Sequence, residues 1–509
     1  NQGYLSATWL RIYRFYIQNV NLEEDDMLDT IISGGKVVTP AGPGYWDIGI
    51  SGEKIVVVAM PGILPTEGTT VIDATGKIVV PGGIEPHAHA AANVQPGARQ
   101  LVSGTPNAGP LDHSLGAIWG GTTTIIDFAP VPNEGDLVEG IQEFLKPWEG
   151  NAYTDYSTHC IYSSKNTPDA INRYSELISA GFPSIKVFTT DIRPPEGRVH
   201  TLTPIGRIDT GRMANVMEQV AKHGGVLAVH GEDDELVMYN YLLAKQRGLW
   251  DWYNVHLIHS NLVEDLAFQK SIRLAQMTGA GMYFVHVTAK EGMRAIQEAR
   301  SDGLPVYGEV LTLALSFICD QYKESDGMKY HTYPSLKYEE DQNYLWDGVM
   351  NGNLAFTATD SSFTTYVDKT AGRNVVDVRG GNIGIEIRMG VNYTEAVVKR
   401  GLSLERFVEV TSSNAAKLLG MYPRKGAIAA DSDADITIID PEFKKPLLMA
   451  DLHVRDYSPW ENWEVEGWPT TVMLRGKLMV NNGELLGSPS DGKLIPRKID
   501  PAVVNKPAF

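Results

Sequence analysis

The sequence predicts an α/β protein: a (β/α)8 barrel of the TIM type, with a β-sandwich domain built from segments on both sides of it. Two observations predict this fold class. Between residues 82 and 425, strand-like apolar runs alternate with helical patterns, as they do around a parallel sheet. In residues 28–81 and 426–487, short strand-like runs follow one another with turn residues between them. Residues 1–27 are then an N-terminal extension, and residues 488–509, rich in proline and lysine, an extended C-terminal arm.

The individual elements follow from these patterns in chain order. The first β region contains the runs DTIISGGKVVT, WDIGISGEKIVVVAM and TTVIDATGKIVV. In the barrel segment, the helical stretch GRMANVMEQVAKHGG leads into the strand VLAVHG, and LVEDLAFQKSIRLAQMTGA leads into GMYFVHVT at residues 281–288. The helix AKEGMRAIQEARSDG precedes the strand LPVYGEV. The last β region, with AIAADSDADITIID and TTVMLRGKLMVNNG, is expected to pair with the first.

The composition is that of a globular protein with a large core. Of the 509 residues, 43% are hydrophobic and 21% are charged, and the formal net charge is -18. Such an acidic surface repels nucleic acid and anionic membranes, so neither is expected as a partner, and no apolar run is long enough to span a bilayer. The two cysteines, Cys160 and Cys319, exclude a disulfide framework and a cysteine-based zinc site, and they favour a cytoplasmic location.

Six residues that can bind a metal or carry a proton fall at or just past the ends of predicted strands. The carboxyl ends of the strands of a (β/α)8 barrel converge on one face, where active sites are built. The six side chains are therefore expected to form one site. They are His87 and His89 after GKIVVPGGIEP, Lys186 in PSIKVFTT, His230 at the end of VLAVH, His286 in MYFVHVT and Asp360 at the end of LAFTATD.

These residue types suit a metal centre. Neutral imidazoles bind zinc-like ions, and an H-x-H pair on an extended segment points both rings the same way. Asp360 is a carboxylate that can bind a metal and take a proton from metal-bound water. Beside a divalent cation Lys186 would be driven neutral, and a neutral lysine amine can capture carbon dioxide as a carbamate that bridges two metals. Two bridged metals would hold a shared hydroxide.

Each residue alone also has an ordinary explanation. The H-x-H pair can lie in a turn, and a lone His230 or His286 can be a core residue whose hydrogen bonds are satisfied. Lys186 can be a strand-end lysine that reaches solvent, and Asp360 can cap a helix or a turn. Their joint occurrence, in this order and at these strand ends, favours the metal centre. Among the other histidines, His256 is the candidate for supporting a metal-binding ring from behind.

The order His-x-His, Lys, His, His, Asp resembles that of the amidohydrolase superfamily, and specifically of its dihydropyrimidinase/hydantoinase branch. The resemblance runs from about residue 28 to 480, through GKIVVPGGIEPHAHA, SIKVF, AVHGED, YFVHVTAKEG and SSNAAKLLGMYPRKGAIAADSDADITIIDP. It implies the same barrel and sandwich, and a homotetramer or homodimer. It also implies two divalent metal ions, with zinc expected and cobalt or manganese as alternatives.

The resemblance also assigns a role to each of the six residues by its place in the motifs. His87 and His89 are expected to bind the more buried metal. The other two histidines, His230 and His286, are expected to bind the more exposed one. A carboxylated Lys186 would bridge both metals, and Asp360, the expected catalytic residue, would bind a metal and shuttle the proton.

The sequence departs from the family pattern where the family binds its substrate. Five residues after the lysine, the family has a tyrosine that donates a hydrogen bond to the developing oxyanion, but this chain has Asp191. The family's S-P-P-L-R loop corresponds to YPSLK, which begins at Tyr333. An asparagine expected just before G-I-E is shifted or lost, with Gly380 or Asn382 in its place. Asp191, Tyr333 and Asn382 are therefore the expected substrate contacts, and the substrate can differ from those of the family.

The predicted function is a metal-dependent hydrolase that opens a cyclic amide, such as a hydantoin, a dihydropyrimidine or an imide. A metal-bridging hydroxide would attack the carbonyl carbon, and Asp360 would pass a proton to the leaving nitrogen. Two alternatives remain open. The same centre could hydrolyse a non-ring amide or carbamate, or the chain could be a non-catalytic scaffold that kept the fold. The presence of all six metal-site residues weighs against the scaffold.

Overall fold

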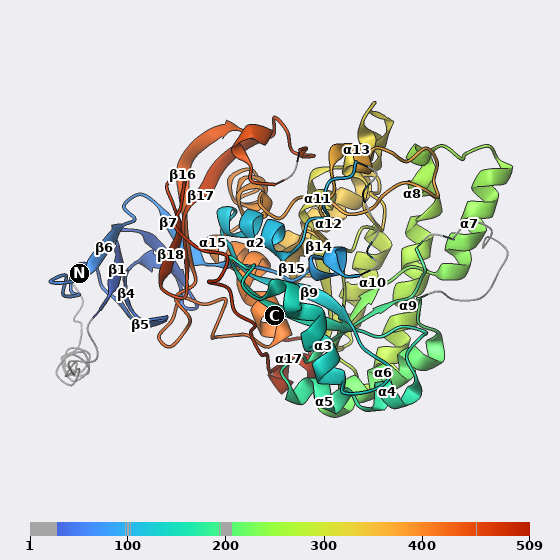
Figure 1. Ribbon diagram of the computed structural model, residues 1–509, viewed down its shortest axis with the longest axis horizontal. Coiled ribbons are helices and arrows are strands. Elements are labelled where there is room, and N and C mark those ends of the chain that lie inside the picture. Colours follow the sequence, from blue (N-terminus) through green and yellow to red (C-terminus); the bar gives the residue numbers. More distant parts are fainter. Residues whose placement is uncertain are drawn as a thin grey trace, which may run out of the picture.

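The computed structural model describes residues 28–96, 98, 101, 103–192, 194, 206–454 and 456–509. The N-terminal extension expected over residues 1–27 therefore lies outside the described residues. The described chain forms one sheet of eight parallel strands surrounded by helices, and beside it two further sheets (Figure 1). The predicted fold class, a (β/α)8 barrel with a sheet domain from both ends of the chain, is confirmed. No helix in the described part of the chain is both long and apolar enough to cross a membrane.

The barrel strands lie side by side in chain order, each parallel to the next. Beyond the last strand, Ser361 pairs with Ala88, which follows the first strand, and the amide of His89 donates to the carbonyl of Ser361 at 2.8 Å. This contact closes the barrel next to the H-x-H pair. The strands are β8 (Gly83–Glu85), β9 (Thr122–Pro130), β10 (Asp155–Ile161), β11 (Ser184–Phe188), β12 (Val226–His230), β13 (Met282–Phe284), β14 (Val306–Leu311) and β15 (Phe356–Ala358).

Helices between the strands cover the outside of the barrel. Two of these helices, α6 and α9, each end at a glycine in the left-handed conformation, Gly224 and Gly279. The helices up to the seventh strand are α2 (Pro110–Trp119), α3 (Leu137–Leu145), α4 (Pro168–Asn172), α5 (Tyr174–Ser179), α6 (Thr210–His223), α7 (Asp234–Gln246), α8 (Val255–Ile258), α9 (Asn261–Thr278) and α10 (Lys290–Ser301). The later ones are α11 (Thr312–Ser316), α12 (Glu339–Asn351), α13 (Tyr366–Lys369), α14 (Arg388–Asn392), α15 (Leu404–Val408), α16 (Asn414–Leu419) and α17 (Pro501–Asn505).

The remaining strands form two sheets that pack face to face. One contains only N-terminal strands, in the order β5-β4-β1-β6, and the other joins N- and C-terminal strands in the order β19-β18-β17-β16-β7-β2-β3. Apolar side chains of both sheets, such as Ile48, Ile55, Val79 and Ile436, share one buried cluster. The strands are β1 (Thr30–Ser33), β2 (Lys36–Thr39), β3 (Gly42–Tyr45), β4 (Asp47–Ser51), β5 (Lys54–Ala59), β6 (Thr70–Asp73), β7 (Ile78–Pro81), β16 (Ile436–Pro446), β17 (Glu464–Leu474), β18 (Lys477–Asn481) and β19 (Glu484–Leu485).

The C-terminal arm packs against the amino-terminal ends of the barrel strands. Arg497 is buried, and its guanidinium donates to the hydroxyls of Ser157 and Ser184. The hydroxyl of Tyr307, at the start of β14, donates to the carbonyl of Val503 at 2.6 Å. The arm therefore covers one end of the barrel and leaves the opposite end, where the six expected site residues lie, to the loops after the strands.

Candidate metal centre

The barrel places five of the six expected site residues at or just past the carboxyl ends of its strands, and the sixth, Lys186, lies within a strand. His87 and His89 follow β8, and Lys186 lies in the middle of β11. Five of the six line one cavity of about 330 Å³, and Lys186 lies buried outside its lining. The other three positions are His230 as the last residue of β12, His286 two residues after β13, and Asp360 two residues after β15.

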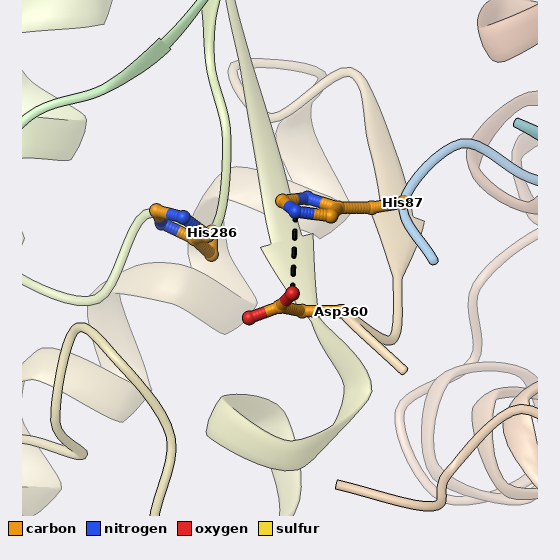
Figure 2. A group of neighbouring side chains, drawn as sticks. All are labelled: His87, His286 and Asp360. Atoms are coloured by element: carbon orange, nitrogen blue, oxygen red, sulfur yellow. Dashed lines mark ion pairs between the residues drawn. The ribbon is translucent and has the colours of Figure 1, made fainter. Parts of the chain in front are cut away.

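The imidazoles gather in two pairs around the cavity. The Nε2 atoms of His87 and His89 lie 3.3 and 3.2 Å from the same oxygen, Oδ1 of Asp360. On the other side, Nδ1 of His230 lies 3.0 Å from Nε2 of His286. Figure 2 shows how His87, His286 and Asp360 face one another, and ligand atoms of these three residues all lie within 4.8 Å of one another.

Burial controls the protonation of these rings. It lowers the pKa values of His87, His230 and His286 below the ordinary value for histidine. Each ring is therefore neutral near pH 7 and keeps one nitrogen lone pair, which is the form of histidine that binds a metal. The donor set of imidazole nitrogens and a carboxylate fits a zinc-like ion.

Lys186 is the unusual member of the group. Its side chain is fully buried, and its Nζ has no hydrogen-bond partner in the described part of the chain. The nitrogen lies 5.1 Å from the ring centre of Phe128 and 4.9 Å from that of Phe188. Burial lowers the pKa of the amine from 10.5 to about 7. A buried amine without an acceptor is costly, and its position suits an amine that carries a further group.

Two buried glutamates that sequence reasoning missed hold the expected metal-binding histidines from behind. Oε1 of Glu309 lies 2.7 Å from Nδ1 of His87 and accepts the backbone amide of His286 at 3.0 Å. The carboxylate of Glu232 lies 2.7 Å from both Nε2 of His230 and Nδ1 of His259. Such contacts fix which nitrogen of a ring faces a metal. Their signal was present in the sequence, since both glutamates lie in the strand-end motifs VYGEV and HGED.

The prediction for His256 is wrong. Its Nδ1 lies 3.0 Å from the carbonyl of Tyr253 in its own turn, on the half-exposed outer side of α8. The supporting histidine is His259, which is fully buried and reaches Glu232. Both histidines lie in the same short stretch, but His256 is within α8 and His259 is the buried residue that directly follows its last residue, Ile258.

Two of the six expected site residues have strained backbones. His286 and Asp360 have φ angles of 41° and 50°, in the left-handed region that non-glycine residues rarely adopt. The expected strands through residue 288 and up to Asp360 are consequently shorter, since β13 ends at Phe284 and β15 at Ala358. Backbone strain of this kind occurs where the surrounding structure fixes a functional side chain.

The three expected substrate contacts lie in different environments. Asp191 and Tyr333 line the cavity, but Asn382 is buried beside it. The carboxylate of Asp191 accepts the backbone amides of Gly206 and Arg207, at 2.6 and 2.8 Å.

The side-chain amide of Asn382 bonds to backbone groups. Its Nδ2 donates to the carbonyl of Thr359 at 2.5 Å, and its Oδ1 accepts the amide of Gly384 at 2.9 Å. Asn382 therefore holds the backbone that leads into Asp360.

Comparisons with known proteins find similar sequences and structures over most of this chain. A model described as the amidohydrolase family matches residues 78–479. Over 477 residues the chain is 32% identical to a D-hydantoinase of Streptomyces coelicolor, covering 92% of this chain and 98% of that protein. It is 31% identical to a D-hydantoinase of Geobacillus stearothermophilus, with 92% and 96% covered. A solved dihydropyrimidinase from Brevibacillus agri superposes with a TM-score of 0.83 at 29% identity, with 92% and 98% of the two chains covered. With this coverage, the chain belongs to the amidohydrolase family.

Proposed function

We propose that this protein is a metal-dependent hydrolase that opens a cyclic amide of the hydantoin, dihydropyrimidine or imide class. The observation that carries the proposal is the convergence of four histidines, Asp360 and a buried Lys186, whose Nζ has no hydrogen-bond partner in the described chain, at one end of the barrel. The relatives named D-hydantoinase and dihydropyrimidinase support the substrate class.

The described side chains can hold two divalent ions. His87 and His89 would bind one ion, and His230 and His286 the other, with zinc expected and cobalt or manganese as alternatives. Lys186 would carry the bridging carboxylate: its neutral amine forms an N–C bond with carbon dioxide and releases a proton. When bound, such ions polarise a carbonyl oxygen and lower the pKa of water.

Asp360 is placed to move the proton of the reaction. Burial alone would raise its pKa, but the neighbouring His87 and His89 outweigh burial and lower it. The carboxylate is therefore ionised near pH 7 and can accept a proton from the attacking water, then deliver it to the ring nitrogen that leaves. Oδ2 of Asp360 also accepts the hydroxyl of Thr332 at 3.4 Å, which limits its rotation.

The cavity suits a small ring. Its volume of about 330 Å³ is at the lower end of the range for small-molecule sites. Phe188, Ile192 and Tyr333 provide apolar wall beside the polar residues. A five- or six-membered ring can rest against this wall with one carbonyl directed at the histidines.

A ring-opening screen with metal-loaded protein tests the proposal. The panel contains hydantoins, dihydrouracil, allantoin, imides and lactams, with linear amides and carbamates as comparison substrates. We expect ring opening of at least one cyclic amide, abolished by a chelator and restored by zinc, cobalt or manganese. Turnover of linear amides alone would redirect the function to them. Protein that binds less than about one equivalent of metal and hydrolyses nothing would support the non-catalytic scaffold.

A further inference from the structure

One wall of the cavity is formed by two chain segments that contain none of the six expected metal-site residues. The first contains Tyr333, and the second contains Arg379, Gly380 and Gly381, all of which line the cavity. The two segments pack tightly together. The hydroxyl of Tyr333 donates to the carbonyl of Val378 at 3.2 Å, and a Cβ on Gly380 would lie 2.5 Å from Cδ2 of the Tyr333 ring.

A single buried lysine joins these segments from behind. Lys369, the last residue of α13, is fully buried, and its Nζ donates to the carbonyl of His331 at 2.5 Å. The same nitrogen donates to the carbonyls of Arg379 at 2.8 Å and Gly381 at 2.5 Å. One of the three carbonyls thus belongs to the first segment, and the other two belong to the residues directly before and after Gly380 in the second.

The number of donors explains why this position holds a lysine. A protonated lysine offers three N–H groups, whereas a neutral amine offers two, so only the ammonium can bond to all three carbonyls. Burial and the charge of Arg379 oppose this protonation and lower the pKa of Lys369 to about 7, while the charge of Asp360 favours it. The three carbonyls are the hydrogen-bond partners of Nζ within the described residues.

The lysine is also linked to the expected proton carrier. The residue after His331 is Thr332, whose hydroxyl donates to Oδ2 of Asp360. Lys369 therefore holds the backbone of two segments that line the same cavity as Asp360, without itself lining that cavity.

We propose that Lys369 is a positioning residue for the substrate: its ammonium holds the 331–333 and 379–381 segments together as the cavity wall against which the ring rests. The proposal rests on the proposed function for the identity of the substrate, but the contacts that hold the wall together do not depend on that function. Loss of the ammonium is expected to weaken substrate binding more than the chemical step, because it releases the wall and leaves the metal-site histidines in place.

The test compares Lys369→Met with Gly380→Ala. The first removes the ammonium and keeps most of the length of the side chain, whereas the second leaves Lys369 intact and pushes Tyr333 away from the 379–381 segment. Each is expected to raise KM by about 10- to 100-fold, the effect of losing charge-assisted hydrogen bonds or close packing, with kcat changed by less than about threefold. Bound metal should remain at the wild-type level. The double variant should raise KM by less than the product of the single effects, because both changes act on one contact.

Hydrogen exchange gives a readout that does not depend on activity. Amides in residues 376–384 should exchange about tenfold faster in Lys369→Met than in the wild type. Lys417→Met is the control, since its nitrogen lies over the rings of Tyr422 and Phe509 away from the cavity, and it should keep wild-type KM and exchange at 376–384. Wild-type exchange or wild-type KM in Lys369→Met would overturn the proposal. If the wild type opens no ring, the proposed function fails, and the exchange result alone decides the role of Lys369.

Discussion

Two buried clusters of metal-ligand side chains lie at opposite ends of the barrel strands, and they differ in what their lysine does. His87, His286 and Asp360 form one cluster at the carboxyl ends. Asp155, at the start of β10, forms the other with Asp433 and Asp435. In each, three ligand atoms lie within 4.8 Å of one another. Proximity of ligand atoms alone therefore does not distinguish a metal site from a structural ion-pair network.

The two clusters differ in whether the buried lysine beside them is paired with carboxylates. Nζ of Lys425 lies 2.6 Å from Asp155 and Asp435 and 3.1 Å from Asp433, so the acidic cluster already contains its cation. Burial opposes the charge of Lys425, but the carboxylates outweigh it and raise its pKa. Lys186 has no such partner in the described chain, and burial lowers its pKa to about 7. The pKa values of the two buried lysines are thus shifted in opposite directions: Lys425 stays charged among its carboxylates, and Lys186 has a substantial neutral fraction near pH 7.

The largest expected effect is that of Lys186→Met. Removing the amine that would carry the bridging carboxylate should lower kcat by at least about 1,000-fold, or about 4 kcal/mol, and should lower the bound metal below two equivalents. The fold should persist, because the Lys186 amine makes no hydrogen bond with the described residues that the variant would break. Steady-state kinetics, elemental analysis and circular dichroism measure the three quantities. Activity above about one tenth of wild type would remove Lys186 from the metal centre.

Lys425→Met should lower the stability of the fold and leave the metal content unchanged, the reverse of what we expect for Lys186→Met. It leaves three buried carboxylates without their ammonium, and breaking a buried pair on one side costs about 3–5 kcal/mol. We expect a lower urea midpoint and less soluble protein, but unchanged metal content per folded molecule. Unfolding curves that match the wild type would show that the acidic cluster does not depend on its cation, and the contrast between the two lysines would be lost.

Glu309→Gln tests whether the hydrogen bonds behind His87 and His286 contribute to metal binding. The amide keeps the shape of the side chain but replaces the carboxyl group that holds Nδ1 of His87 and the backbone amide of His286. Metal affinity should fall by about 10- to 100-fold, measured by competition with a chelator. Glu232→Gln, which changes the partner of His230 and His259, should weaken the centre by a similar factor. An unchanged affinity in both variants would mean that the histidines are held by packing alone.

The pKa of Lys186 also predicts how the centre assembles with pH. An amine with a pKa of about 7 is roughly one tenth neutral at pH 6 and nine tenths neutral at pH 8. Only the neutral form reacts with carbon dioxide, so loading of metal-free protein should be about tenfold faster at pH 8 when dissolved carbon dioxide is held constant. Lys425, whose pKa is raised, stays charged across this range. Equal loading rates at both pH values would contradict the assignment.

Much of the fold and the metal-site group could be predicted because the information is local. Strand-like runs, helical periodicity and glycine stops lie within short stretches, and the six ligand-type residues follow from where those runs end. Glu232 and Glu309 lie in the same stretches and could have been included. For the residues of the candidate metal centre, a place at or near the end of a predicted strand is thus enough to suggest a metal-binding role.

The rest could not be predicted because it depends on contacts between distant segments. Nothing in the sequence near Lys369 indicates that its ammonium reaches His331 and Gly381. Likewise, Asn382 was expected at the substrate, but its amide bonds to Thr359 and Gly384. The early ends of β13 and β15 reflect left-handed backbones at His286 and Asp360, which no propensity of histidine or aspartate requires.

The smallest expected effect is at Asp191, which lines the cavity of the candidate metal centre but makes hydrogen bonds of a structural kind. The residue lines the metal-site cavity, yet its carboxylate accepts the amides of Gly206 and Arg207, as the carboxylates around Lys425 accept their ammonium. Asp191→Asn keeps an acceptor for these amides, so kcat should change by less than about threefold. If Asp191 instead contacted the developing oxyanion, kcat should change by about 100- to 1,000-fold. Stopped-flow or steady-state kinetics on the best ring substrate separates the two, and a large change would move Asp191 from a structural anchor to the chemistry.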